Sequence, residues 1–423
     1  MRRVRHWAAA ALAVSVLTAA TATATTATAA TAPNAATTPT APTTAAGAAG
    51  ATSAGARFTP AKLPLEGAIL SSGAQLDART TWAAGFRLTG DNGRLRFAPT
   101  VAERVGADGP WRELPLPAAD FEGRATAVAG SSARDAWLVG DLDRHTGRIL
   151  AQHWNGTTWT STTIEAPPGE LNSAYLLGVS APRPGRAWAV GGASVVTGRT
   201  PGPTPGDPPL TETRTTGVIE RWDGTAWHRI DAPEIDGNWW LNSVTEIAPD
   251  DVWAVGNTSY PDDRPVLLHY DGHDWTRVAA PAFTGLYGEY QSVAAAGPDD
   301  VWVVGRAVLT DKDRGHPLVA HYDGRSWSTV AAPEGVAGKL WSVTATPGGM
   351  AAVGWDASGE QDQPLGLRLT HGRWETLDLS VPGYVNQSYQ AVVAGPGGRL
   401  TAVGAGTTPK SSDYQPLVVT GRR

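Results

Sequence analysis

Residues 248–275 contain two motifs that decide the fold: Ala248-Pro-Asp-Asp-Val-Trp-Ala-Val-Gly256 and, further on, Tyr270-Asp-Gly-His-Asp-Trp275. In both, short apolar runs flank turn residues. Pro-Asp-Asp favours a tight turn, and Asp-Gly favours a two-residue β-hairpin. Pro265, between the motifs, stands where a third strand is expected to begin, a place where a strand tolerates proline. This segment therefore predicts four short antiparallel strands.

The same pattern recurs along the chain. A tryptophan followed by small apolar residues and glycine occurs five times, and two degenerate copies replace the tryptophan; the first residues are Trp82, Trp137, Trp188, Trp253, Trp302, Ala351 and Thr401. Four strands repeated seven times predict an all-β, seven-bladed β-propeller over residues 57–423. An array of β-sandwiches is disfavoured, because the six to eight residues between copies cannot link separate sandwiches.

The two ends of residues 57–423 predict how the ring closes. The last copy ends at Arg423, before its fourth strand. Near the other end, Phe58 and Pro64 have the six-residue aromatic-to-proline spacing of Trp227 and Pro233. We therefore expect the N-terminal strand to complete the last blade, which would remove an exposed sheet edge.

The first residues are typical of a secretory signal. Basic residues such as Arg2 precede the short apolar stretch Ala8–Ala20, and alanine-rich sequence follows. We expect a signal peptide over residues 1–30 and a disordered Ala/Thr/Pro-rich linker over 31–56. The protein is thus expected to be secreted to the extracellular space, with no membrane insertion after signal removal, because no later apolar stretch is long enough to span a bilayer.

Composition excludes several classes of site. The chain has no cysteine, so it forms no disulfide and no thiolate metal site. Its net charge is −6, which does not favour nucleic-acid binding. His153, His269 and His321 share one repeat slot on different blades and are not expected to converge on a metal. We expect no metal, no cofactor, no catalytic residue and a monomeric protein.

The repeats Asp-Val-Trp-Ala-Val-Gly and aromatic-Asp-Gly-x-x-Trp resemble secreted actinobacterial β-propellers with Kelch-like and Asp-box-like repeats. The resemblance covers residues 57–423 and implies the fold, but propellers host unrelated functions. Kelch repeats end their second strand in Gly-Gly, which only Gly191-Gly192 matches here. Sialidase Asp-boxes have Asp-x-Gly, whereas here Asp is followed directly by Gly. No catalytic residue is therefore carried over from either group.

The repeat also separates the eighteen tryptophans into two groups. Thirteen occupy repeat slots and are expected to pack between blades. Trp7 lies in the expected signal peptide. The four others lie on the predicted face formed by blade-to-blade and second-to-third-strand loops: Trp239, Trp240, Trp341 and Trp355. Because variable loops on a rigid scaffold often carry binding residues, we expect these four to serve a ligand rather than the core.

The candidate ligand-binding site groups these rings with polar neighbours on blades 4 to 7: Trp239, Trp240, Asn242, Tyr287, Gln291, Arg306, Trp341, Trp355, Asp356, Tyr384 and Asn386. Flat rings stack on sugar faces, and amides bond hydroxyls. The pattern indicates a non-enzymatic protein that binds a carbohydrate or cell-wall glycan. A protein-interaction platform, a packed central plug, and a glycan hydrolase or lyase using Glu289 and Asp356 stay as alternatives.

Two further expectations concern neighbouring segments. Tyr290 and Tyr389 fill a slot that is leucine in other copies, so we expect them to be core residues. Residues 192–217 make one copy longer than the rest, and residues 201–209 are rich in proline. We expect this segment to be a loop insertion on the binding face.

Overall fold

The computed structural model describes residues 58–89, 96–117, 123–142, 148–165, 167–204, 206–259, 263–310, 312–359 and 361–422. The expected signal peptide 1–30 and linker 31–56 lie outside the described residues. Within them the structure is all-β, apart from the single-turn 3-10 helix Pro396–Gly398. No helix in this part of the chain is long and apolar enough to cross a membrane.

The strands form seven four-stranded antiparallel sheets, which we call blades 1 to 7 in chain order. Blade 1 comprises β2(Ala68–Gln75), β3(Thr80–Thr89), β4(Arg96–Val105) and β5(Trp111–Leu114). Blade 2 comprises β6(Gly123–Ser132), β7(Asp135–Leu142), β8(Arg148–Trp154) and β9(Trp159–Ser161). Blade 3 comprises β10(Leu171–Arg183), β11(Arg186–Thr200), β12(Leu210–Trp222) and β13(Trp227–Arg229).

The second half of the chain repeats this arrangement. Blade 4 comprises β14(Trp239–Ala248), β15(Asp251–Thr258), β16(Pro265–Tyr270) and β17(Trp275–Arg277). Blade 5 comprises β18(Tyr287–Gly297), β19(Asp300–Val308), β20(His316–Tyr322) and β21(Trp327–Thr329). Blade 6 comprises β22(Lys339–Thr346), β23(Gly349–Asp356), β24(Gln363–Thr370) and β25(Arg373–Thr376). Blade 7 comprises β26(Val385–Gly395), β27(Arg399–Thr408), β28(Ser411–Gly421) and the N-terminal β1(Phe58–Pro60).

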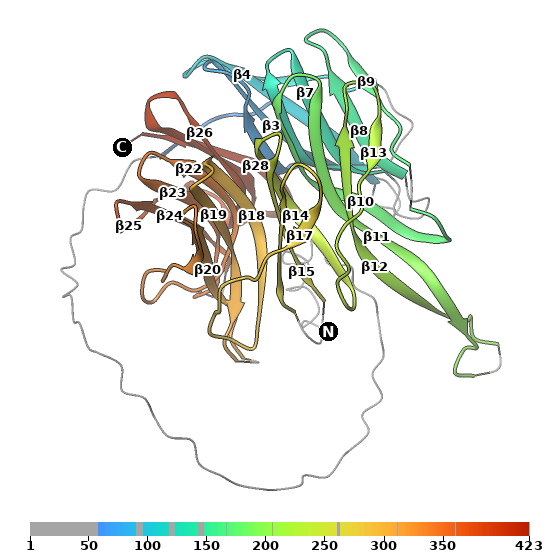
Figure 1. Cartoon of the computed structure of the whole chain (residues 1–423). Helices are drawn as coiled ribbons and strands as arrows, with labels where there is room; N and C mark the ends of the chain where they lie inside the picture. Colours follow the sequence, from blue (N-terminus) through green and yellow to red (C-terminus); the bar gives the residue numbers. More distant parts are fainter. Residues whose placement is uncertain are drawn as a thin grey trace, which may run out of the picture. The chain divides into compact units, whose positions relative to one another are not determined.

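The blades are joined in a closed ring. The first strand of each blade contacts the first strands of both neighbours, and β26 contacts β2 to complete the circle. Figure 1 shows the same order, with the red C-terminal strands beside the blue N-terminal ones. First strands are therefore innermost, an arrangement consistent with a seven-bladed β-propeller.

The predicted ring closure is confirmed. Strand β1 pairs antiparallel with β28, with Phe58 opposite Gly421 and Pro60 opposite Val419. A Cβ at residue 421 would lie 2.9 Å from the Phe58 ring, so glycine gives the ring its space. The first and last described strands thus share one sheet, and β28 has no free edge beside β1.

Tryptophans in the repeat slots pack between blades as expected. The second-strand tryptophan of one blade contacts an aromatic pair at the third and fourth strands of the next. The centroid distances to the fourth-strand rings are 5.6 Å for Trp82–Trp159, 4.8 Å for Trp137–Trp227, 5.4 Å for Trp188–Trp275 and 5.2 Å for Trp253–Trp327. All four second-strand rings are buried, so the indoles are part of the apolar core between these blades.

Every innermost strand contains a β-bulge at the same point of the repeat. One inserted residue there has no partner on the second strand; the seven are Ser71, Thr126, Leu177, Asn242, Gln291, Trp341 and Gln390. Each of them is half-buried. A bulge redirects the side chains around it, so these positions present one side chain per blade along the innermost strands.

The segment 192–217 is mostly strand, so the prediction of a loop insertion is wrong for its two arms. Strands β11 and β12 stay paired as far as Thr200 opposite Leu210 and form the projecting ribbon of Figure 1. Threonine is frequent in both arms and valine occurs in the first, and both residue types favour extended structure. The pairing of the two arms ends at Thr200 and Leu210, and the described residues of the proline-rich tip between them are not strand.

Candidate functional site

Three cross-strand pairs occupy equivalent places on blades 4, 5 and 6, where the first strand begins and the second ends. They are Trp240–Asn257, Glu289–Arg306 and Lys339–Trp355. The bulge residue of each blade follows two residues after the first member. We call the nine residues the blade 4–6 cluster: Trp240, Asn242, Asn257, Glu289, Gln291, Arg306, Lys339, Trp341 and Trp355.

A charge group made of buried Lys339 and half-buried Glu289 and Arg306 occupies the centre of this cluster. One carboxylate oxygen of Glu289 lies 2.8 Å from Lys339 Nζ and 3.0 Å from Arg306 Nε. The other oxygen accepts a hydrogen bond from Gln291 Nε2 at 3.2 Å. Lys339 is 6 % exposed. Blades 5 and 6 are therefore joined at their innermost strands by an ion pair with little access to water.

Electrostatics keep the carboxylate ionised. Burial opposes ionisation of Glu289, but the charges of Lys339 and Arg306 outweigh it and lower the pKa of Glu289 below its usual value. Burial lowers the pKa of Lys339 to about 8, against the attraction of Glu289. At neutral pH Glu289 is thus a paired anion, and it lacks the raised pKa that a general acid requires.

Two of the three indoles of the cluster, those of Trp240 and Trp341, differ in their polar contacts. Trp240 Nε1 donates to Asn242 Oδ1 at 3.1 Å, and Asn242 Nδ2 donates to the backbone oxygen of Tyr290 in the next blade at 2.7 Å. Trp341 Nε1 is buried and has no hydrogen-bond partner among the described residues. The Lys339 ammonium lies 3.7 Å from the centroid of the Trp341 ring. Both rings are half-buried.

Sequence reasoning did not find Lys339 and considered Glu289 only as a possible enzymatic carboxylate. A signal for both was present in the repeat. Every innermost strand except that of blade 1 has a valine two residues after its bulge, and Trp240, Glu289 and Lys339 each lie four residues before that valine in their own strand. Aligning the copies on that valine would have placed the anion and the cation at one position of adjacent blades.

Trp239 is a core residue, so the expectation that all four tryptophans outside the repeat slots lie outside the core is wrong for this one. It is 3 % exposed and packs with Trp188 and Leu241 between blades 3 and 4. Its ring occupies the space that a Cβ at Gly217 would need. Consecutive residues of a strand face opposite sides, so only Trp240 of the Trp-Trp pair remains outside this core.

Four other predicted site residues have local contacts that do not join them to the cluster. Asp356 accepts a hydrogen bond at 2.7 Å from the backbone amide two residues later. Asn386 has a left-handed backbone with φ of 50° and donates to a threonine hydroxyl at 3.2 Å. Tyr384 packs against the core of blades 6 and 7, and Tyr287 is half-buried at the start of β18.

Tyr290 and Tyr389 are core residues, as expected, with exposed fractions of 1 % and 0 %. The expected assignment of core and surface residues therefore holds for these two tyrosines and fails for Trp239.

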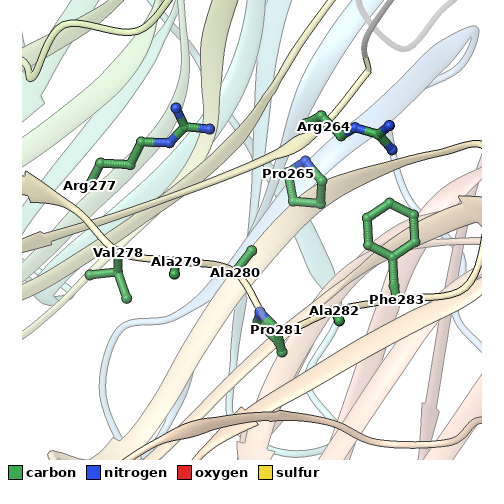
Figure 2. Close-up of a pocket in the computed structure, with 9 residues that line it drawn as sticks. All are labelled: Arg264, Pro265, Arg277, Val278, Ala279, Ala280, Pro281, Ala282 and Phe283. Atoms are coloured by element: carbon green, nitrogen blue, oxygen red, sulfur yellow. The ribbon is translucent and has the colours of Figure 1, made fainter.

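An open pocket of about 610 Å³ lies beside the outer strands of blade 4. Figure 2 shows its lining, an apolar loop between two arginines: Arg264, Pro265, Arg277, Val278, Ala279, Ala280, Pro281, Ala282 and Phe283. It contains no carboxylate and shares no residue with the blade 4–6 cluster.

The three histidines of the common repeat slot each contact an aspartate of their own blade, for example His269 Nε2 with Asp251 Oδ1 at 2.9 Å. The same ring lies 4.3 Å from the ring of Trp253. In the described part of the chain, no group of three or more His, Asp or Glu residues is placed to hold a metal ion.

No family model matches the chain, and none of the curated proteins matches it. Among solved structures it is similar to YCF48 from Cyanidioschyzon merolae, with 14 % identity, a TM-score of 0.51, and coverage of 86 % of this chain and 98 % of that one. A leech intramolecular trans-sialidase has 10 % identity, a TM-score of 0.44, and coverage of 88 % and 70 %. A fucose-specific lectin from Aleuria aurantia has 14 % identity, a TM-score of 0.43, and coverage of 76 % and 100 %. The likeness to YCF48 shows a shared fold.

Proposed function

We propose that this protein is a secreted carbohydrate-binding protein whose ligand site is the blade 4–6 cluster. The observation that carries the proposal is the gathering of aromatic rings, amides and paired charges at equivalent places on three adjacent innermost strands. Half-buried Trp240 and Trp341 supply flat apolar surface. Such rings suit the apolar face of a sugar, while amide groups suit its hydroxyls.

Binding without chemical conversion is the form of this proposal that the electrostatics support. Glycoside hydrolysis uses a pair of carboxyl groups, one of which is protonated at neutral pH. Glu289 is held ionised by Lys339 and Arg306. The other candidate carboxylate, Asp356, accepts a hydrogen bond from the amide of Ser358 in its own loop. This pairing of both groups favours recognition over hydrolysis.

The test uses the full chain, a glycan array and then calorimetry with the sugars that bind. We expect Trp240→Ala and Trp341→Ala each to weaken binding about tenfold, the loss of roughly 1.4 kcal/mol of contact free energy. Trp374→Ala is the matched control, because Trp374 is also half-buried but lies on the outermost strand β25 of blade 6. Equal affinity of all three variants and the wild type would rule out the cluster as the site.

A protein-interaction platform is the second candidate, and the pocket of Figure 2 favours it. Its alanine- and proline-rich floor lies next to Leu286, which is 49 % exposed. Arg264 Nη1 bonds the backbone oxygen of Leu286 at 3.0 Å and fixes this edge. If this pocket is the functional surface, Ala280→Glu will abolish capture of a protein partner, and the tryptophan variants of the cluster will leave that capture intact.

A further inference from the structure

The bulge residue of blade 3, Leu177, has an apolar side chain, and the other six fall into two groups according to what their polar side-chain atoms bond. In blades 1, 2 and 4 the side chain donates to a backbone oxygen of the next blade, always that of the residue just before its bulge. These bonds are Ser71 Oγ to Ala125 O at 2.6 Å, Thr126 Oγ1 to Leu176 O at 2.6 Å, and Asn242 Nδ2 to Tyr290 O at 2.7 Å. In these blades the bulge residue ties two innermost strands together, which is a structural role.

In blades 5, 6 and 7 the bulge residues make no such bond among the described residues. Gln291 Nε2 contacts Glu289, and Gln390 Nε2 donates to Ser388 Oγ at 3.0 Å, in both cases two residues back on the same strand. Trp341 Nε1 is buried without a partner. The bulge residues of these three consecutive blades therefore leave two amide oxygens and one indole N–H without hydrogen-bond partners among the described residues. Six other buried tryptophan N–H groups also lack a partner there, but none of them lies on an innermost strand.

An unpaired donor in a buried place costs free energy unless a partner arrives with a ligand. Lys339 covers one face of the Trp341 ring, so the N–H edge is the polar group that this indole can offer. The neighbouring blades place Gln291 before it and Gln390 after it at the same level of the ring. The three side chains thus form one row of hydrogen-bonding groups along the innermost strands.

The charges around this row are matched. Lys339 and Arg306 both lie against Glu289, and the charge of Arg306 is one of the influences that lower the pKa of Asp313, which lies 3.3 Å from His316 Nε2. Two cations thus face two carboxylates. The site has no surplus cation for a ligand carboxylate or sulfate, so it suits an uncharged ligand.

We propose that Gln291, Trp341 and Gln390 are the ligand-contacting row, and that they take an uncharged sugar with adjacent hydroxyls. The inference rests on the proposed function and deepens it. A hydroxyl both donates and accepts, so neighbouring hydroxyls can donate to the amide oxygens and accept from the indole N–H. The row includes Gln390 and leaves Asn242 to hold blades 4 and 5 together.

The test is calorimetric titration of the full chain with two groups of oligosaccharides. One group is neutral and contains gluco-, manno-, xylo- and N-acetylglucosamine oligomers; the other contains galacturonate oligomers. We expect binding in the neutral group. Trp341→Phe, which keeps a ring and removes the N–H, and Gln390→Ala should each weaken it about 3- to 10-fold.

Ser71→Ala and Thr126→Val are the matched controls, because they alter the same bulge position in blades 1 and 2. They should lower the melting temperature and leave the affinity unchanged. Gln390→Ala should instead weaken the affinity and leave the melting temperature unchanged. Wild-type affinity in both Trp341→Phe and Gln390→Ala would overturn the row and leave the proposed function standing. Preference for galacturonate oligomers would overturn the inference that the ligand is uncharged. Failure of the wild type to bind any sugar would overturn both the row and the proposed function.

Discussion

At the tryptophan slot of the repeat, blades 1 and 2 meet through aromatic rings, whereas blades 7 and 1 meet through an arginine and two threonines. In the first, the Trp82 ring is wholly buried against Trp154 and Trp159. In the second, Thr401 occupies the tryptophan slot and Arg104 occupies the facing aromatic slot. Both positions therefore differ from the repeat at the same interface.

Hydrogen bonds replace the missing indole at the closing interface. Arg104 donates to Thr401 Oγ1 at 3.1 Å and to Thr420 Oγ1 at 2.9 Å. Its guanidinium carbon lies 5.0 Å from the centroid of the Trp111 ring, and the residue is 4 % exposed. The comparison teaches that the two facing positions on adjacent blades change together. Where Thr401 replaces the indole on blade 7, Arg104 on blade 1 replaces the facing aromatic residue and bonds to it.

The largest effect is expected at an indole interface. Trp253→Ala should lower the free energy of unfolding by roughly 3–5 kcal/mol, since it removes a 4 %-exposed ring packed against Tyr322 and Trp327. Denaturant unfolding measures this change. A loss below about 1 kcal/mol would show that these indoles do not hold the blades together.

The second-largest loss of stability is expected when Arg104, the cation between blades 7 and 1, is removed. Arg104→Ala should cost about 2–4 kcal/mol, because the hydroxyls of Thr401 and Thr420 lose a charged donor and the cavity stays buried. The double change Arg104→Tyr with Thr401→Trp recreates the apolar unit. We expect it to be more stable than Arg104→Ala in the same unfolding experiment; if it is less stable, the two slots are not interchangeable as a unit.

A smaller loss is expected where the N-terminal strand completes blade 7. Phe58→Ala should cost about 1–2 kcal/mol, because the ring is only half-buried where it packs on Gly421. Thermal unfolding of the full chain provides the readout. Thr59→Ala, an exposed neighbour on the same strand, is the control and should melt with the wild type. An unchanged melting temperature for Phe58→Ala would mean that this ring adds nothing to ring closure.

The smallest effect is expected at the ribbon of blade 3, which is not part of any blade interface described above. Replacing residues 197–212 by a short Gly-Ser turn should change the free energy of unfolding by less than about 1 kcal/mol, because the described residues removed from the ribbon are nearly all exposed. A large loss of stability would show that the projecting ribbon supports blade 3.

Much of the scaffold could be predicted from the sequence, because its signals are local. Turn residues, apolar runs and repeat spacing each depend on neighbouring residues, and seven copies reinforce one another. The N-terminal completion of blade 7 was predictable for the same reason, since the last copy lacks one strand and Phe58 begins a matching one. The burial of Tyr290 and Tyr389 followed from their leucine slot.

Tertiary structure alone decided which side chains of the candidate site belong to the core. Trp239 and Trp240 are adjacent in sequence, and only the facing Gly217 of blade 3 makes room for one of them in the core. The pairing of Glu289 with Lys339 depends on two blades that meet in space. A bulge in each innermost strand shifts the register of its side chains. Whether a bulge residue bonds to the backbone of the next blade depends on whether its side chain extends far enough to reach it. These are contacts between distant segments, which residue patterns within one repeat do not encode.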